Sequence, residues 1–454
     1  MAYSEDHSKA ALTPSLQFTK KSKGEKRVSF PSDEEMVSGF AEHKDVWRDV
    51  DSITLKEIIA NYKQACQKHQ VEPKSMILEQ LQGITDVSNR ARCLDLKGER
   101  LDYQSCESLE EILKLLQFEI INLQETELEE NGASALLDMI LYYESTAHLD
   151  MSSNTNIGVG GWQALSHLLQ KSRCLRRLDA CNLPLQEYPA QRLSRALRCS
   201  RLAVLHLDNA SLNGQPLFTL VCALKVNCAL QELYLGNNKL NSYQDAMQLG
   251  ELLKYNHCLK LLDLSNNLIS DAGLEEICDG LRVQRNGIRS IVLWNNQITH
   301  RGMLHLASTL PCVTTLETLN LGHNNIQDKG IQELKEGLIA NRSLLQLGLA
   351  YTGITCEGAV ATAEFIVESL RIQRLDVRKN LIRAAGLMAL SLALRINHSL
   401  IRVDLDKKPK KEKEAFLIET QKNLLQEIRN QCLSNAAAAK KTVFNTAPQP
   451  EDTL

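Results

Sequence analysis

The sequence predicts an α/β solenoid in which a strand, a loop and a helix repeat, with a parallel sheet on the concave side and helices outside. Segments such as LQELYLGNNKL, LKLLDLSNNLI and LETLNLGHNNI share the pattern L-x-x-L-x-L-x-x-N-x-L. This pattern starts at 175, 202, 230, 259, 288, 316, 344, 372 and 400, at intervals of 27 to 29 residues, and weaker copies start at 91, 118 and 146. A repeat of this length is one strand-and-helix unit that buries its apolar face only against its neighbours.

Within each unit, the side-chain periodicity separates the strand from the helix. In the copy at 259, alternation points Leu262 and Leu264 inward and Asp263 outward, as in a strand with one buried face. Leu274 and Ile277 then follow at helical spacing and cover the strand leucines. The loop before each helix carries a glycine at repeat position fifteen, namely Gly273, Gly302, Gly330, Gly358 and Gly386.

An asparagine at repeat position nine is suited to bond the backbone of the bend beyond each strand. It recurs as Asn238, Asn267, Asn296, Asn324 and Asn380. We expect these side chains to have a structural role.

These features resemble the ribonuclease-inhibitor type of leucine-rich repeat, and the resemblance spans residues 91–405. It implies a horseshoe whose ends need caps. We expect a helical N-terminal cap over 50–90, where Thr54 and Glu57 form a T-x-x-E capping box. At the other end, 406–454 reads as a basic linker, an amphipathic helix over 412–433 and a disordered tail.

Composition and motifs give no support for an enzyme or a cofactor site. The formal net charge is −3, and no apolar run is long enough for a membrane span or a secretory signal, which indicates a cytoplasmic or nuclear protein without a nucleic-acid or membrane partner. The thirteen cysteines include no C-x-x-C pair, so we expect no metal site. Catalytic signatures such as G-x-S-x-G or H-E-x-x-H are absent from the sequence.

The first 49 residues lack the repeat and read as a disordered arm. Residues 20–27, KKSKGEKR, are strongly basic and 33–35 are acidic, so this segment cannot bury enough apolar surface to offset chain entropy. Within it lies KRVSF, in which Val28 and Phe30 are two residues apart and therefore point to the same side of an extended chain.

KRVSF matches the R-V-x-F docking motif of proteins that bind the catalytic subunit of protein phosphatase 1. By strand addition to a sheet edge, Val28 and Phe30 would fill apolar pockets, while Lys26 and Arg27 would meet acidic groups. Met36 and Val37 would prolong the strand.

KRVSFPSDEEMVSG, YKQACQKH and the repeat type together resemble the leucine-rich-repeat regulatory subunits of protein phosphatase 1. That resemblance implies a phosphatase-binding subunit that inhibits or redirects activity, with no catalytic residues of its own. The family carries a long low-complexity C-terminal extension, from which this sequence departs by ending at Leu454.

Several readings stay open beside this one. Exposed aromatics on the concave sheet, Tyr234, Trp294 and Tyr351, are candidate contacts for other proteins, and a scaffold unrelated to phosphatases would use that face alone. Ser29 follows basic residues and is a candidate phosphorylation site that would weaken docking. The lysine clusters at 20–27 and 407–413 fit either solvated linkers or nuclear-import signals.

Overall fold

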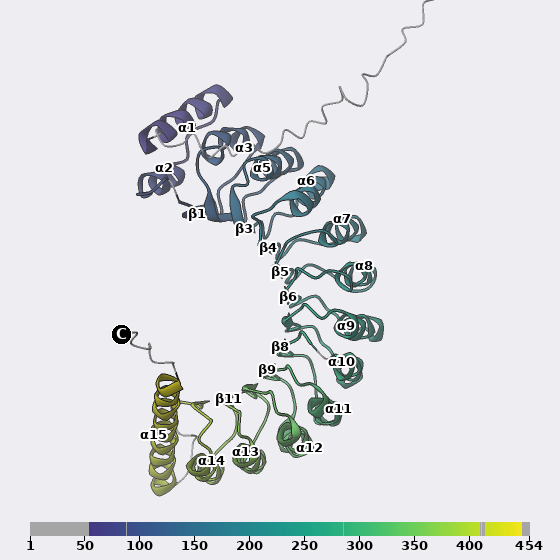
Figure 1. Ribbon diagram of the computed structural model, residues 1–454, viewed down its shortest axis with the longest axis vertical. Coiled ribbons are helices and arrows are strands. Elements are labelled where there is room, and N and C mark those ends of the chain that lie inside the picture. Colours follow the sequence, from purple (N-terminus) through teal and green to yellow (C-terminus); the bar gives the residue numbers. More distant parts are fainter. Residues whose placement is uncertain (1–53, 88, 285, 409, 411–413, 447–454) are drawn as a thin grey trace, which may run out of the picture. The chain divides into compact units, whose positions relative to one another are not determined.

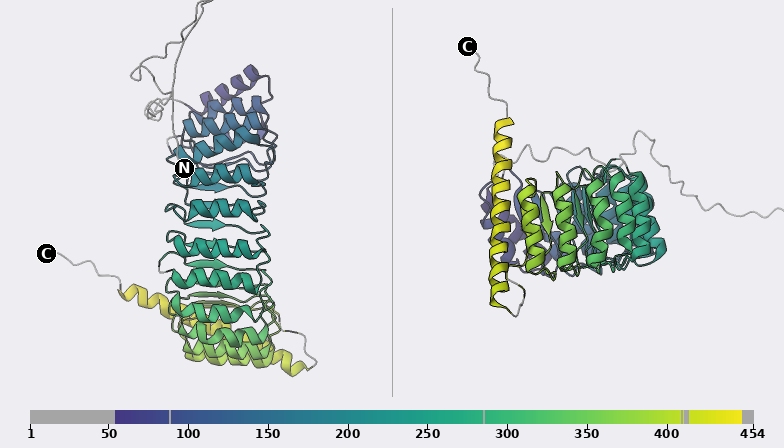
Figure 2. Two further views of the ribbon diagram at one scale, coloured as in Figure 1. Left: turned by 90° about the vertical axis from the view of Figure 1, so that its right-hand side faces the viewer. Right: turned by 90° about the horizontal axis from the view of Figure 1, so that it is seen from below.

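The structure is a computed structural model that describes residues 54–446 except 88, 285, 409 and 411–413, with side chains to residue 439. The predicted arm and the end of the predicted tail lie outside these residues. The described chain forms a curved solenoid with one sheet on its concave side and helices on its convex side (Figures 1 and 2). The predicted fold class is therefore confirmed.

The twelve strands of the described residues lie in one parallel sheet in sequence order. The strands are β1 Ala91–Asp95, β2 Phe118–Asn122, β3 Thr146–Asp150, β4 Arg177–Asp179, β5 Val204–His206, β6 Glu232–Tyr234, β7 Leu261–Asp263, β8 Ser290–Val292, β9 Thr318–Asn320, β10 Gln346–Gly348, β11 Arg374–Asp376 and β12 Arg402–Asp404. Equivalent repeat positions are paired throughout, for example Leu233 with Leu262 and Leu262 with Ile291. Each concave row of side chains is therefore built from a single repeat position.

The helices of the array lie behind this sheet, one or two per repeat. They are α3 Tyr103–Ser108, α4 Glu110–Leu113, α5 Glu130–Tyr142, α6 Gly158–Lys171, α7 Glu187–Leu197, α8 Gln215–Leu224, α9 Tyr243–Tyr255, α10 Asp271–Val283, α11 Gly302–Thr309 with the 3-10 turn Leu310–Cys312, α12 Gln327–Ala340, α13 Cys356–Glu368 and α14 Ala384–Ile396. Leu262, Leu264, Leu274 and Ile277 are completely buried between the two layers. Burial of each leucine contributes about 1.5–3 kcal/mol, which is the main stabilisation of the repeats.

The asparagines at repeat position nine bond the backbone of the bend, as predicted, and their bonds also link neighbouring repeats into a ladder. The Nδ2 of Asn324 donates to the carbonyl oxygens of Leu293 at 2.8 Å and Leu321 at 2.9 Å, and its Oδ1 accepts the amide of Asn296 at 2.8 Å. Asn238, Asn267, Asn296 and Asn380 make equivalent bonds and are likewise buried. Each side chain thus supplies hydrogen bonds to backbone groups that the bend after the strand would otherwise leave unpaired.

Two neighbouring helices approach closely at a pair of glycines. A Cβ on Gly280 of α10 would lie 2.2 Å from the carbonyl oxygen of Gly250 in α9. No side chain fits at that distance, so glycine is required for this helix spacing.

The half-buried carboxylate of Glu144, in the loop between α5 and β3, links two neighbouring repeats. Glu144 accepts hydrogen bonds from Ser172 Oγ at 2.7 Å, the Arg173 amide at 2.8 Å and Cys174 Sγ at 2.8 Å. Burial disfavours its charged form, but these hydrogen bonds outweigh burial and hold the pKa of Glu144 below its usual range.

The N-terminal end of the array is covered by α1 Leu55–His69 and α2 Ser75–Gln82. The capping box is confirmed, because Thr54 Oγ1 accepts the Glu57 amide while the Thr54 amide donates to Glu57 Oε2 at 2.7 Å. Tyr62 and Ile77 are buried, and the Tyr62 hydroxyl accepts the Lys74 amide. The apolar edge of the first repeat is thereby shielded from water.

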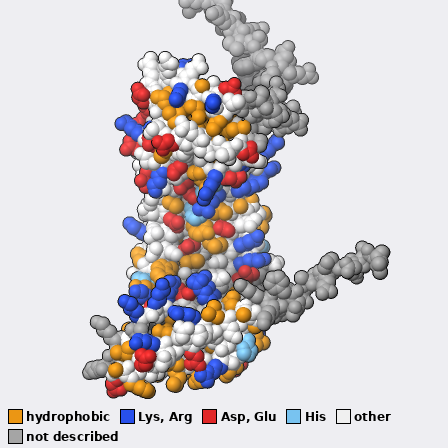
Figure 3. Space-filling view, turned by 90° about the vertical axis from the view of Figure 1, so that its left-hand side faces the viewer, with side chains coloured by type: hydrophobic (Ala, Val, Ile, Leu, Met, Phe, Trp, Pro, Cys, Tyr) orange, Lys and Arg blue, Asp and Glu red, His pale blue; other side chains and the backbone are white. Residues whose placement is uncertain are grey.

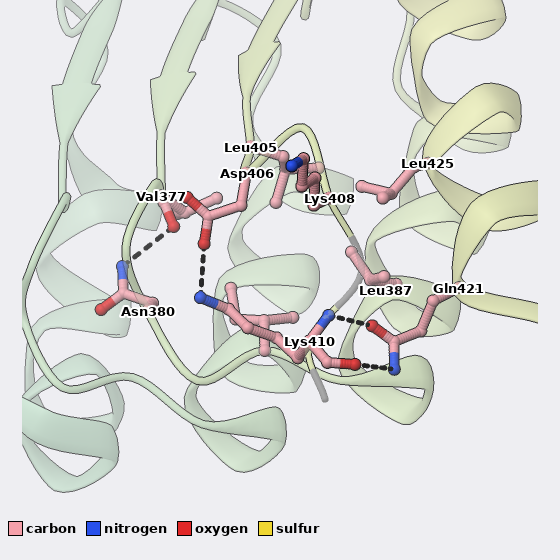
Figure 4. A pocket seen from close by; sticks show the side chains of 10 residues that line it. Val377, Asn380, Leu387, Leu405, Asp406, Lys408, Lys410, Gln421 and Leu425 are labelled. Atoms are coloured by element: carbon pink, nitrogen blue, oxygen red, sulfur yellow. Dashed lines mark hydrogen bonds and ion pairs between the residues drawn. The ribbon is translucent and has the colours of Figure 1, made fainter. Parts of the chain in front are cut away.

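A long helix, α15 Ala415–Thr446, packs against α14 and β12 at the other end (Figures 1 and 2). It runs well past residue 433, so the predicted end of this helix is wrong. The run of alanines after 435 favours helix strongly, and Asn435 anchors it by donating to the carbonyl oxygens of Asn397 and Leu400 at 3.0 Å. Ahead of it, Lys410 pairs with Asp406, and its amide donates to Gln421 at 2.8 Å (Figure 4).

Candidate functional site

The residues predicted from the sequence to contact other proteins, Tyr234, Trp294 and Tyr351, belong to the concave face of the sheet. Figure 3 views this side and shows basic side chains in separate groups, with apolar and acidic side chains between them. None of the described helices is long and apolar enough to cross a membrane.

An aromatic row crosses three consecutive repeats just beyond the strands. The ring centroids of Trp294 and His323 are 5.7 Å apart, and those of His323 and Tyr351 are 5.3 Å apart. Tyr351 is 49% exposed, His323 is exposed and Trp294 is half-buried. Flat, exposed aromatic groups of this kind are the commonest anchors of protein interfaces.

The position of Trp294 depends on a glycine in the next repeat. A Cβ on Gly322 would lie 2.3 Å from the Trp294 ring, which shows that the indole lies directly against the Gly322 backbone. His323 is held as well, because its Nδ1 lies 2.9 Å from Asn295 Oδ1. The row is therefore held in place before any partner arrives, which lowers the entropy cost of binding.

Tyr234 lies apart from this row and is engaged within the sheet. Its ring stacks on His206 at a centroid distance of 3.8 Å, and its hydroxyl donates to Glu232 at 3.0 Å. Burial, together with the neighbouring Glu232 carboxylate, raises the pKa of Tyr234 to about 12. The three predicted aromatic contacts thus divide into a pair, Trp294 and Tyr351, and a separate residue.

A polar cluster centred on Asp179 surrounds that stack. Asp179 lies 2.7 Å from His148 Nε2 and 3.0 Å from Arg177 Nε. Burial disfavours its charge, but the hydrogen bonds from His148 and Arg177 prevail and lower the pKa of Asp179. For His206, burial and the Arg177 charge lower the pKa, although the nearby Asp179 carboxylate opposes them.

Arginines at the C-terminal end of the face are paired with aspartates on the same surface. Arg374 and Arg402 both bond Asp404, and Arg378 bonds Asp376. The guanidinium groups are therefore held in fixed positions on the concave surface by these aspartates.

The predicted docking residues Lys26, Arg27, Val28, Phe30, Met36 and Val37, and the candidate phosphosite Ser29, lie outside the described residues. Sequence reasoning missed His323, which joins Trp294 to Tyr351. An alignment of the repeats by position would have identified His323, because His323 and Tyr351 both occupy repeat position eight.

The comparisons with known proteins support the repeat assignment and identify proteins to which the chain is similar. A leucine-rich-repeat model matches residues 255–278 and 314–335. Protein phosphatase 1 regulatory subunit 37 from Homo sapiens is 57% identical, and that from Bos taurus 55% identical, over 293 residues that cover 64% of this chain and 42% of each relative. A homolog of the same subunit from Caenorhabditis briggsae is 37% identical over 309 residues, covering 65% of this chain and 33% of the relative.

The chain thus spans about two-fifths of the length of these mammalian relatives. Among solved structures, a chain of the yeast Rad7 and Elc1 complex has a TM-score of 0.41 at 15% identity, covering 79% of this chain and 94% of that one. The family resemblance inferred from the sequence is confirmed by the regulatory-subunit relatives.

Proposed function

Because the chain is a homologue of protein phosphatase 1 regulatory subunit 37, we propose that it is a non-catalytic regulatory subunit that binds the protein phosphatase 1 catalytic subunit. The observation that carries this proposal is the 53–57% identity to mammalian proteins of that name.

The docking element in this proposal is the R-V-x-F segment. Val28 and Phe30 enter apolar pockets as the segment adds a strand to the enzyme, and Arg27 supports them. Binding at such a groove lets the regulator inhibit or redirect the enzyme without a catalytic group of its own. The concave face supplies a second contact or recruits a substrate, with Trp294 and Tyr351 as its anchors.

Capture of the purified phosphatase catalytic subunit tests the proposal. The full chain should retain the enzyme, and the Val28→Ala/Phe30→Ala variant should lose most of that capture because both pocket-filling side chains are gone. Ser29→Ala is the matched control, since it changes the alternate residue of the same strand and should bind like the unmodified chain. Undiminished capture by both the double variant and a chain lacking residues 1–49 would overturn the docking proposal.

The exposed aromatic row supports a second candidate, a protein-binding scaffold that does not engage the phosphatase. Competition with an R-V-x-F peptide separates the two functions. Displacement of the phosphatase from the full chain supports the regulatory subunit. A failure of the full chain to retain the enzyme at all supports the scaffold.

A further inference from the structure

Four polar side chains form a square on the concave face where β4 and β5 meet. Asp179 pairs with His206 in the sheet register, and Cys181 and Asp208 each follow two residues later. Cys181 and Asp208 lie in the turns just beyond these strands, where their donor atoms approach that of His206. These four residues adjoin the stacked rings of His206 and Tyr234 described above.

Three of these residues bring metal-binding atoms together. The Cys181 sulfur, one ring nitrogen of His206 and one carboxylate oxygen of Asp208 all lie within 4.8 Å of one another, and all three residues are half-buried. A tetrahedral cation with bonds of about 2.0–2.3 Å to sulfur, nitrogen and oxygen requires separations shorter than this limit, so the side chains would rotate inward on binding.

Among the described residues, one donor group lacks a hydrogen-bond partner and another forms no ion pair. His206 Nε2 is buried and has no hydrogen-bond partner among the described residues; its nearest acidic atom is Asp179 Oδ1 at 3.8 Å. Asp208 accepts the Gly236 amide at 2.6 Å but forms no ion pair with any residue that the structure describes. A buried polar atom without a partner costs about 1–3 kcal/mol, so a bound cation would relieve the site.

The surroundings favour a cation. Asp179 and Asp208 place two carboxyl groups near the imidazole of His206. Metal binding to Cys181 would release the thiol proton to solvent.

We propose that Cys181, His206 and Asp208 form a binding site for a single thiophilic divalent cation of the Zn²⁺ type. Sulfur and imidazole donors select such ions over Mg²⁺ and Ca²⁺, which prefer oxygen ligands. Three protein ligands leave a fourth position open on the concave face for water or for a donor from a bound partner.

This site departs from the expectation that the chain has no metal site. That expectation rested on short sequence spacings such as C-x-x-C, whereas here the ligands come from two neighbouring repeats. The 27-residue interval between 175 and 202 brings position seven of one repeat beside position seven of the next.

Cobalt binding to the full, metal-stripped chain tests the site. We expect one equivalent of Co²⁺ to produce the near-ultraviolet cysteine-to-cobalt charge-transfer band, and Zn²⁺ to displace it. Cys181→Ser should abolish the band, and Asp208→Asn should weaken Co²⁺ binding by at least about tenfold. Cys312→Ser, which changes an exposed cysteine in another repeat, should bind like the unmodified chain. Circular dichroism of each variant checks that it is folded.

A second measurement needs no substitution. Zn²⁺ should slow alkylation of Cys181 in the unmodified chain while leaving the exposed Cys199 unaffected, as followed by mass spectrometry. No charge-transfer band in excess Co²⁺, a band that persists in Cys181→Ser, or alkylation of Cys181 that Zn²⁺ does not slow would each overturn the proposal. None of these results depends on phosphatase binding.

Discussion

Replacing Asn324 by alanine should weaken the asparagine ladder at one rung. Three of its side-chain hydrogen bonds measure 2.8, 2.8 and 2.9 Å, and the residue is 3% exposed. Asn324→Ala leaves one backbone amide and two carbonyl groups without these short bonds, and it also removes the 3.2 Å bond from the Ile298 amide. At about 1–2 kcal/mol for each group, the free energy of unfolding should fall by roughly 3–6 kcal/mol.

Urea denaturation followed by far-ultraviolet circular dichroism measures this loss. Repeat arrays can unfold a few units at a time, so a local measurement is needed as well. The amides of Asn296 and Ile298 donate hydrogen bonds to Asn324 Oδ1, and their hydrogen-exchange rates should be measured in the same variants. Asn325→Ala is the matched control: this neighbour is exposed, and its one side-chain bond, from Gln327, is to another surface group. Equal stability and equal exchange in the two variants would refute the ladder as a source of stability.

Four further outcomes are expected. Gly280→Ala should lower the free energy of unfolding by about 1–3 kcal/mol, because the added methyl group meets the backbone of α9. Gly83→Ala is the control: its methyl group would lie 3.4 Å from the nearest atom, so urea denaturation should show almost no change in stability. The pKa of Glu144 is lowered in the folded state, so its stabilisation is present above the ordinary carboxyl pKa and lost as pH falls through the folded value. Glu144→Gln should therefore cost about 1–2 kcal/mol at pH 7 and less at acid pH, as measured by urea unfolding across pH. Trp294→Ala should reduce any phosphatase capture that remains after the docking segment is removed, with an unchanged circular dichroism spectrum. Ser29→Glu, or phosphorylated Ser29, should weaken capture, because it adds negative charge to the docking segment; equally tight binding would contradict that switch.

The positions of the repeated pattern in the sequence were sufficient to predict the order of the strands and the burial of their leucines. Leu262 and Leu264 recur with period two and Leu274 and Ile277 at helical spacing, so local pattern and packing agree. The asparagine ladder was predictable for the same reason, since Asn324 has one possible role in the bend.

Features that depend on two repeats at once were not predicted. Tyr234 reads as an exposed aromatic residue until its neighbour on β5 is known, and only the pairing with His206 shows that its ring is covered. The length of α15 was missed because the alanine run has little amphipathic pattern, although Asn435 fastens it to the last repeat.

Stacking of equivalent positions explains how the concave face acquires its shape. In the column at repeat position seven, Asp208 is followed by Gly236 and Trp294 by Gly322. In both cases the larger side chain leans over the next glycine, since a Cβ there would lie 2.8 Å from Asp208 Oδ1 or 2.3 Å from the Trp294 ring. Each glycine therefore positions a side chain of the preceding repeat, and a substitution at Gly236 or Gly322 acts on the surface of its neighbour. Asp208 of the proposed metal site and Trp294 of the aromatic row both depend on this arrangement.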